Sequence, residues 1–153
     1  LFFSTSTGQT ENSEEVFSSK VPYLRSVSST WDEASPVYED SSSFELKDFY
    51  AKLGLEYNDK ITAEVTETTS TGRVRKIKIN GVEFNGRDVA TKLSLRSNYF
   101  SIIQNGTTVT INTKGFGHGV GMSQYGALGM AKEGYKYNEI LKHYYQGTEI
   151  KKI

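Results

Sequence analysis

The chain has 153 residues, of which 36% are hydrophobic and 12% aromatic, and this is enough apolar material to build the core of one ordinary domain. Its formal charge at pH 7 is zero, so the total charge does not point to nucleic acid or an acidic membrane surface as a partner. The absence of cysteine excludes disulfides, thiolate catalysis and cysteine-based zinc sites within these residues.

The charges are unevenly distributed along the chain. Residues 1–45 contain eight acidic side chains against only Lys20 and Arg25, whereas the remainder has sixteen basic and ten acidic side chains, an excess of six positive charges. Two solvated surfaces of opposite sign are the simpler interpretation. A basic surface that faces an anionic polymer is the alternative.

The first third of the chain is rich in Ser, Thr, Gly and Glu. Short apolar pieces at residues 1–3 and 21–24 predict strand ends joined by long loops. Because the opening triplet resembles the inside of a strand, we expect the chain to be a fragment that lacks an upstream segment. Ser43 predicts the N-cap of a helix over residues 44–53, and Gly54 predicts its end.

From Lys60 onward the apolar residues alternate with polar ones. This period of two predicts strands over residues 61–65 and 74–79. The dipeptide Asn80-Gly81 follows the second strand and is typical of a type I′ turn, which needs a positive φ at both central residues. The sequence therefore predicts an antiparallel hairpin.

A short helix over residues 86–93 and a second hairpin are expected next. The strands of this hairpin are predicted at residues 99–103 and 109–111, with Asn105-Gly106 at the turn. The fold class is therefore α+β, with antiparallel hairpins and several helices.

The last third predicts two helices. One runs over residues 124–133, with Ser123 as its N-cap and Gly134 after its end. In the other, Asn138 is the expected cap and Gly147 the end. Internal repeats and low-complexity linkers are absent, so we expect no domain boundary.

Six of the 14 glycines lie between Gly115 and Gly129, in the pattern G-F-G-H-G-V-G-M-S-Q-Y-G. Alternate glycines allow a ligand or another chain segment to approach the backbone closely. The helix start at Ser123 adds backbone N–H groups that suit an oxygen-rich ligand. The pattern fits neither a dinucleotide fingerprint nor a P-loop nor a nucleophile elbow.

His118 lies between two glycines of this motif. Its imidazole could bind a substrate, join a metal site or brace the loop. The only other histidine, His143, falls on a predicted helix, so we predict no metal and no cofactor. A metal-assisted hydrolase that uses His118 stays open as a lesser hypothesis.

Two motifs carry a resemblance to a known family. Residues 117–127, G-H-G-V-G-M-S-Q-Y-G-A, resemble the C-terminal signature of the stage II sporulation protein D (SpoIID/LytB) family. Residues 3–14, F-S-T-S-T-G-Q-T-E-N-S-E, resemble a second motif of that family, which continues in residues 21–27 and Trp31-Asp32. Gln9 stands where the family has a second glycine.

The resemblance implies a peptidoglycan lytic transglycosylase that acts during sporulation and engulfment. Such an enzyme cleaves the MurNAc–GlcNAc linkage of peptide-free glycan strands and leaves a 1,6-anhydro end. A single carboxyl group acts as acid and then as base, and the family motif that carries it has no counterpart here. The catalytic glutamate is therefore expected upstream of Leu1.

The resemblance also implies where the chain belongs. The 153 residues would be the C-terminal part of a single catalytic domain and form one side of a substrate groove that is incomplete without the upstream segment. Expected partners are glycan strands, that segment and other sporulation cell-wall proteins, with no nucleic acid. The location would be extracytoplasmic, with a membrane anchor in the N-terminal segment.

We predict that substrate is bound by side chains of the two motifs, namely Ser4, Thr5, Glu11, Asn12, His118, Ser123, Gln124 and Tyr125. Trp31 and Phe116 could stack on sugars or belong to the core. Glu11 and Glu14 are local alternatives for the acid, although such residues also cap helices. A non-catalytic glycan-binding module is the alternative function.

Overall fold

The computed structural model describes residues 1–153, and its contacts divide them into two compact units. Unit 1 consists of Leu1–Tyr38 and Gly115–Ile153, and unit 2 is Glu39–Lys114. No linker separates the two units at either junction, because Tyr38 leads directly into a strand and Gly115 directly follows one. That both units belong to a single larger domain stays a prediction.

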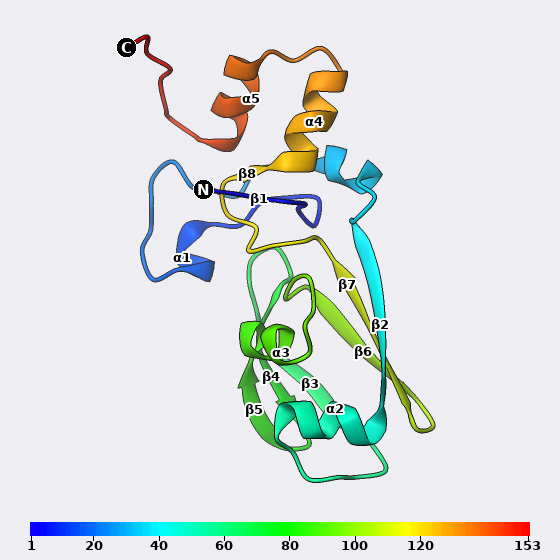
Figure 1. The fold of residues 1–153 in the computed structure, drawn as a ribbon. Coiled ribbons are helices and arrows are strands. Elements are labelled where there is room, and N and C mark those ends of the chain that lie inside the picture. Colours follow the sequence, from blue (N-terminus) through cyan, green and yellow to red (C-terminus); the bar gives the residue numbers. More distant parts are fainter. The chain divides into compact units, whose positions relative to one another are not determined.

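Unit 2 contains two antiparallel three-stranded sheets and two helices (Figure 1). One sheet has the order β2-β7-β6 and the other β3-β4-β5. The bounds of the strands are Glu39–Glu45 for β2, Ala63–Thr68 for β3, Val74–Ile79 for β4, Val82–Asn85 for β5, Phe100–Asn105 for β6 and Thr108–Lys114 for β7. The helices are α2 (Leu46–Leu53) and α3 (Gly86–Lys92). The second agrees with the helix predicted over residues 86–93. Buried side chains from both sheets and both helices, including Phe49, Ile79, Val89 and Ile111, form one core.

The first predicted turn is confirmed. Asn80 and Gly81 have φ angles of 49° and 82°, and Ile79 pairs with Val82, as in a two-residue type I′ turn. The second turn lies one residue further along than predicted. Asn105 pairs with Thr108, so Gly106, with a φ of 61°, is the first central residue of that turn.

The predicted start of α2 is wrong. Ser43 and Phe44 lie in β2, where they pair with Thr110 and Val109 of β7, and the helix begins at Leu46. Pairing with a distant strand outweighs the local capping preference of Ser43. The predicted end is confirmed, because Gly54 adopts a left-handed conformation with a φ of 70°.

Unit 1 has shorter elements joined by long loops. They are β1 (Phe2–Phe3), α1 (Ser13–Val16), the 3-10 helix η1 (Thr30–Ala34), β8 (Met122–Ser123), α4 (Gln124–Lys132) and α5 (Tyr137–Tyr144). β1 and β8 pair in parallel, which is an exception to the antiparallel rule of the other sheets. Met130, Ile140 and Tyr144 are the buried residues of the apolar cluster of this unit.

Both helices of the last third are present. Ser123 caps α4 as predicted, because its Oγ accepts a hydrogen bond from the N–H of Gly126. The predicted cap of α5 is wrong: Asn138 lies inside the first turn, and Glu139 accepts a hydrogen bond from the N–H of Lys136 at 3.1 Å. The α+β class is confirmed, whereas the groove and the need for an upstream segment stay predictions.

Two searches of the structure gave negative results. None of the helices is both long enough and apolar enough to cross a lipid bilayer. Nowhere do three or more His, Asp or Glu side chains come together as a set of metal ligands.

Candidate functional site

The two motifs that lie more than 100 residues apart in the sequence lie against each other in unit 1. Thr5 and Phe116 form an antiparallel bridge in which each backbone N–H donates to the other residue's carbonyl, at 3.1 and 2.7 Å. The N–H of Glu11 donates to the carbonyl of Gly119 at 2.8 Å. The two motifs therefore form one structural site.

The glycines of the motif allow this close packing. A Cβ atom on Gly121 would lie 2.2 Å from the carbonyl oxygen of Leu1, and one on Gly117 would lie 2.9 Å from the Cβ of Phe3. Both residues also have positive φ angles. The sequence predicts that these glycines let either a ligand or another chain segment approach the backbone. These contacts show the approach of another chain segment.

Asp32 is the polar centre of the site, and its side chain is fully buried. Its carboxylate accepts hydrogen bonds from the hydroxyl of Ser123 at 2.5 Å, from that of Ser29 at 2.7 Å and from that of Ser6. Since Ser29 gives its only hydroxyl hydrogen to Asp32, Tyr144 must donate to Ser29, at 2.7 Å. This network joins the N-terminal motif, η1, α4 and α5.

Three of the predicted substrate-binding residues are buried, namely Thr5, Glu11 and Ser123. Thr5 and Ser123 use their hydroxyls inside the unit, since that of Thr5 lies 2.9 Å from the hydroxyl of Ser35 and that of Ser123 is bound to Asp32. In this arrangement their side chains hold the site together rather than face solvent.

The other predicted residues are more accessible. Gln124 is exposed, whereas Ser4, Asn12, His118 and Tyr125 are partly buried. The carbonyl of Ser4 accepts a hydrogen bond from the N–H of Tyr125 at 3.0 Å, which brings these two together. The Oδ1 atom of Asn12 accepts one from the N–H of Ser26 at 2.8 Å. Binding of substrate by any of the eight stays a prediction.

His118 braces the glycine loop. Its Nδ1 accepts a hydrogen bond from the N–H of Val120 at 3.0 Å, and its ring lies 5.7 Å from that of Phe3 and 5.6 Å from that of Phe17. An Nδ1 that accepts a hydrogen bond carries no proton, so a neutral imidazole here has its hydrogen on Nε2. The structural role that the sequence left open for this residue is present.

Neither local acid is placed to protonate a substrate in this structure. The guanidinium of Arg25 donates two hydrogen bonds to the carboxylate of Glu14, one of them at 2.9 Å, and this contact lowers the pKa of Glu14 to about 2. Glu14 is therefore ionised at neutral pH and has no proton to donate. The side chain of Glu11 is fully buried, so a substrate cannot reach its carboxyl.

Trp31 packs on α4 and α5. Its Nε1 donates to the carboxylate of Glu133 at 2.8 Å, and its ring meets that of His143 edge-on at 5.4 Å. A Cβ on Gly129 would lie 2.5 Å from the Cβ of Trp31, so this glycine is needed for the contact. These contacts agree with the prediction that Trp31 could belong to the core. Phe116, for which the same two roles were predicted, is 39% exposed.

The sequence did not single out Ser6 or Ser29, and it gave Asp32 only as part of a motif. Short runs of Ser and Thr, such as residues 4–7, are the one signal that could have suggested a buried hydroxyl network. The partner of those hydroxyls could not be identified because Ser6 and Asp32 are separated by 26 residues and Ser123 and Asp32 by 91.

No protein-family model matches the chain. It is 49% identical over 150 residues to the stage II sporulation protein D of Bacillus amyloliquefaciens and 48% identical over 150 residues to that of Bacillus subtilis, in each case over 97% of this chain. It is also 38% identical over 85 residues, 54% of its length, to the amidase enhancer of Bacillus subtilis, of which it covers 12%. The chain spans 44% of the length of the two sporulation proteins, which fits a C-terminal portion. By this similarity the chain belongs to the stage II sporulation protein D family.

Proposed function

We propose that the chain is part of a peptidoglycan lytic transglycosylase that acts during sporulation. The names of its relatives support a role in the sporulation cell wall, since two are stage II sporulation proteins and a third is an amidase enhancer. The observation that carries the proposal is the assembly of both family motifs into one site around Asp32.

In this proposal the reaction needs one carboxyl group that first protonates the leaving oxygen of the MurNAc–GlcNAc linkage. The same group then takes the proton of the 6-hydroxyl as the 1,6-anhydro ring closes. Since Glu14 is held ionised by Arg25 and Glu11 is buried, we assign this carboxyl to a glutamate outside the 153 residues. We also propose an extracytoplasmic location, with a membrane anchor outside these residues.

The site in unit 1 would then bind the strand rather than cut it. Gln124 is the most accessible of the predicted residues, and Ser4 and Tyr125 adjoin it through their backbone hydrogen bond. These three side chains offer amide and hydroxyl groups to sugar hydroxyls and acetamido groups. Other sporulation cell-wall proteins are proposed as partners on the same grounds.

The test uses a protein of the full length of its relatives and purified glycan strands without stem peptides. Mass spectrometry of the products should show 1,6-anhydro ends. Gln124→Ala should weaken strand binding, whereas Lys132→Ala, an exposed change at the other end of α4, should not. Reducing ends in place of anhydro ends would refute the transglycosylase reaction.

A non-catalytic glycan-binding module is the second candidate. It is favoured by the two local acids, since Glu14 is ionised and Glu11 is buried out of reach of a substrate. This candidate requires that the longer protein retains glycan strands in a pull-down experiment and leaves their length distribution unchanged.

A further inference from the structure

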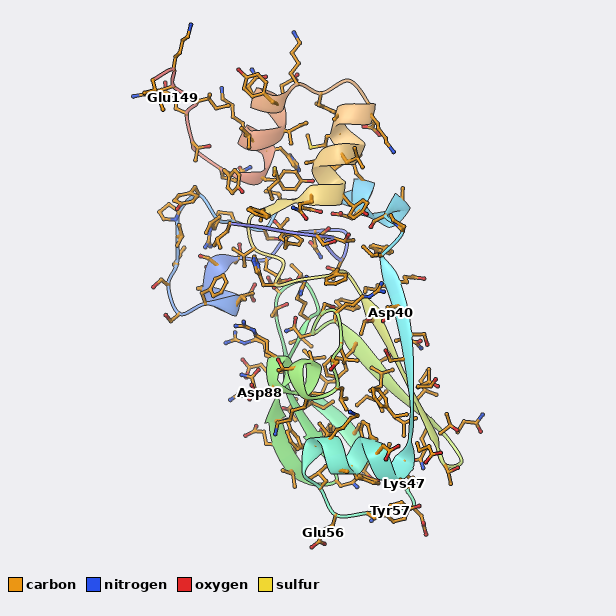
Figure 2. All side chains as sticks on the ribbon, viewed as in Figure 1. Asp40, Lys47, Glu56, Tyr57, Asp88 and Glu149 are labelled. Atoms are coloured by element: carbon orange, nitrogen blue, oxygen red, sulfur yellow. The ribbon has the colours of Figure 1, made fainter.

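Unit 2 has a hollow of about 460 Å³ that none of the sequence motifs touches. It lies at the end of the β2-β7-β6 sheet where β2 begins and β7 ends, near Asp40, which Figure 2 labels. Its size falls within the range of about 300–1,000 Å³ that is typical of small-ligand pockets. All of its lining residues belong to this one unit.

Its floor consists of small polar side chains on one face of the sheet. Asn112 of β7 pairs with Ser41 of β2 on one side and with Ser101 of β6 on the other. Residues that are directly paired point to the same face, and all three are exposed. One amide and two hydroxyls thus stand side by side, and they offer both donors and acceptors.

The walls of the hollow are aromatic and charged. Tyr99 forms one wall, with the ammonium of Lys114 5.9 Å from the centre of its ring. Glu39 pairs with Lys114 on the same face as Asn112, so its carboxylate also lines the hollow. Asp40 pairs with Thr113 and so points to the opposite face of the sheet, where Arg96 lies 3.7 Å from its carboxylate. An acceptor carboxylate, an amide and an aromatic wall together suit a ring that carries many hydroxyls.

We propose that this hollow binds a neutral pyranose ring, specifically an N-acetylated hexosamine. The carboxylate of Glu39 would accept hydrogen bonds from ring hydroxyls, Asn112 would exchange hydrogen bonds with the acetamido group, and Tyr99 would contact the apolar face of the ring. The choice of an N-acetylated sugar rests on the proposed function. The polar and aromatic lining stands independently of it.

The test is an NMR titration of the ¹⁵N-labelled 153-residue chain with N,N′-diacetylchitobiose, a neutral disaccharide. Amide shifts are expected at Ser41, Ser101 and Asn112, and Asn112→Ala should lower the affinity at least tenfold. Asn105→Ala is the matched control, because Asn105 is an exposed residue of β6 that does not line the hollow. Its affinity should equal that of the unchanged chain.

Two results would overturn the proposal. They are the absence of shifts at these residues at millimolar disaccharide and an unchanged affinity in Asn112→Ala. The outcome is separable from that of the proposed function. Anhydro products without binding here would refute the hollow alone, and binding here without anhydro products would refute the transglycosylase alone.

Discussion

The hydroxyl of Ser123 and the carboxylate of Asp32 lie 2.5 Å apart, although 91 residues separate them in the sequence. Ser123 also caps α4, so the same side chain fixes the start of a helix and one branch of a buried network. Both family motifs therefore depend on one carboxylate for their arrangement.

Replacing Asp32 should destabilise unit 1 strongly. Asp32→Asn puts an amide among three hydroxyls that now donate to two carboxylate oxygens, and the mismatch should cost about 2–4 kcal/mol. Urea unfolding followed by circular dichroism measures this loss. Glu33→Gln, an exposed change next in the sequence, should stay within about 0.5 kcal/mol, and equal losses in both variants would contradict a central role for Asp32.

Gly126→Ala should be destabilising even though alanine is the better helix former. A Cβ at this position would lie 2.1 Å from the hydroxyl oxygen of Tyr144 and 2.4 Å from the Oγ of Ser29. The resulting crowding should cost about 1–3 kcal/mol, more than the gain of helix propensity.

The crowding can be separated from other effects with a second change. Because Tyr144→Phe removes the nearest of the clashing atoms, the penalty of Gly126→Ala should shrink in that background. Thermal unfolding of the four proteins of the cycle measures this coupling. Strictly additive changes would show that the short distance does not cause the loss.

The ion pair of Glu14 and Arg25 predicts a dependence of stability on acid. The hydrogen bonds from Arg25 lower the pKa of Glu14 from 4.5 to about 2 in the folded chain. The stabilising contribution is therefore complete above about pH 4.5 and is lost as the pH falls toward 2. Carboxyl NMR should give a midpoint near 2 for Glu14, and Arg25→Gln should move it back toward the ordinary value. A midpoint that stays unchanged in Arg25→Gln would refute Arg25 as the cause of the low pKa.

Tyr144 should titrate only at very high pH. Burial raises its pKa to about 12, whereas the phenol of an unfolded chain ionises near 10. The proton is therefore held more tightly in the folded state, and stability should fall as the pH rises from about 10 through 12. Tyr144→Phe should remove this part of the alkaline loss. Tyr137→Phe, at a side chain that is 71% exposed, should leave it in place.

Local features were predictable from the sequence. The turn at Asn80-Gly81, the end of α2 at Gly54 and the cap of α4 at Ser123 each depend on the conformation of one or two residues. Such preferences are properties of the residues themselves, and they hold at these positions because no distant partner competes with them.

Features that depend on distant partners were not predictable. Ser43 has the chemistry of a helix cap but lies in β2 because Thr110 of β7 pairs with it. The hydroxyls around Asp32 come from three separate segments, and the glycine loop meets Leu1 and Phe3 from the other end of the chain. The sequence shows the residue types of the site, whereas only the fold shows which of them meet.

The junctions of the two units bear on the order in which unit 1 can assemble. Its two pieces are separated by residues 39–114, and closing a flexible loop of that length costs about 4 kcal/mol of chain entropy. The first and last residues of this stretch, Glu39 and Lys114, are paired across β2 and β7, and the next residues outward, Tyr38 and Gly115, share a backbone hydrogen bond of 2.8 Å. Once β2 and β7 have paired, the two ends of residues 39–114 are already close together. Joining the two pieces of unit 1 then costs little further chain entropy. The inserted unit thus lowers the chain-entropy cost of bringing the two motifs of unit 1 together.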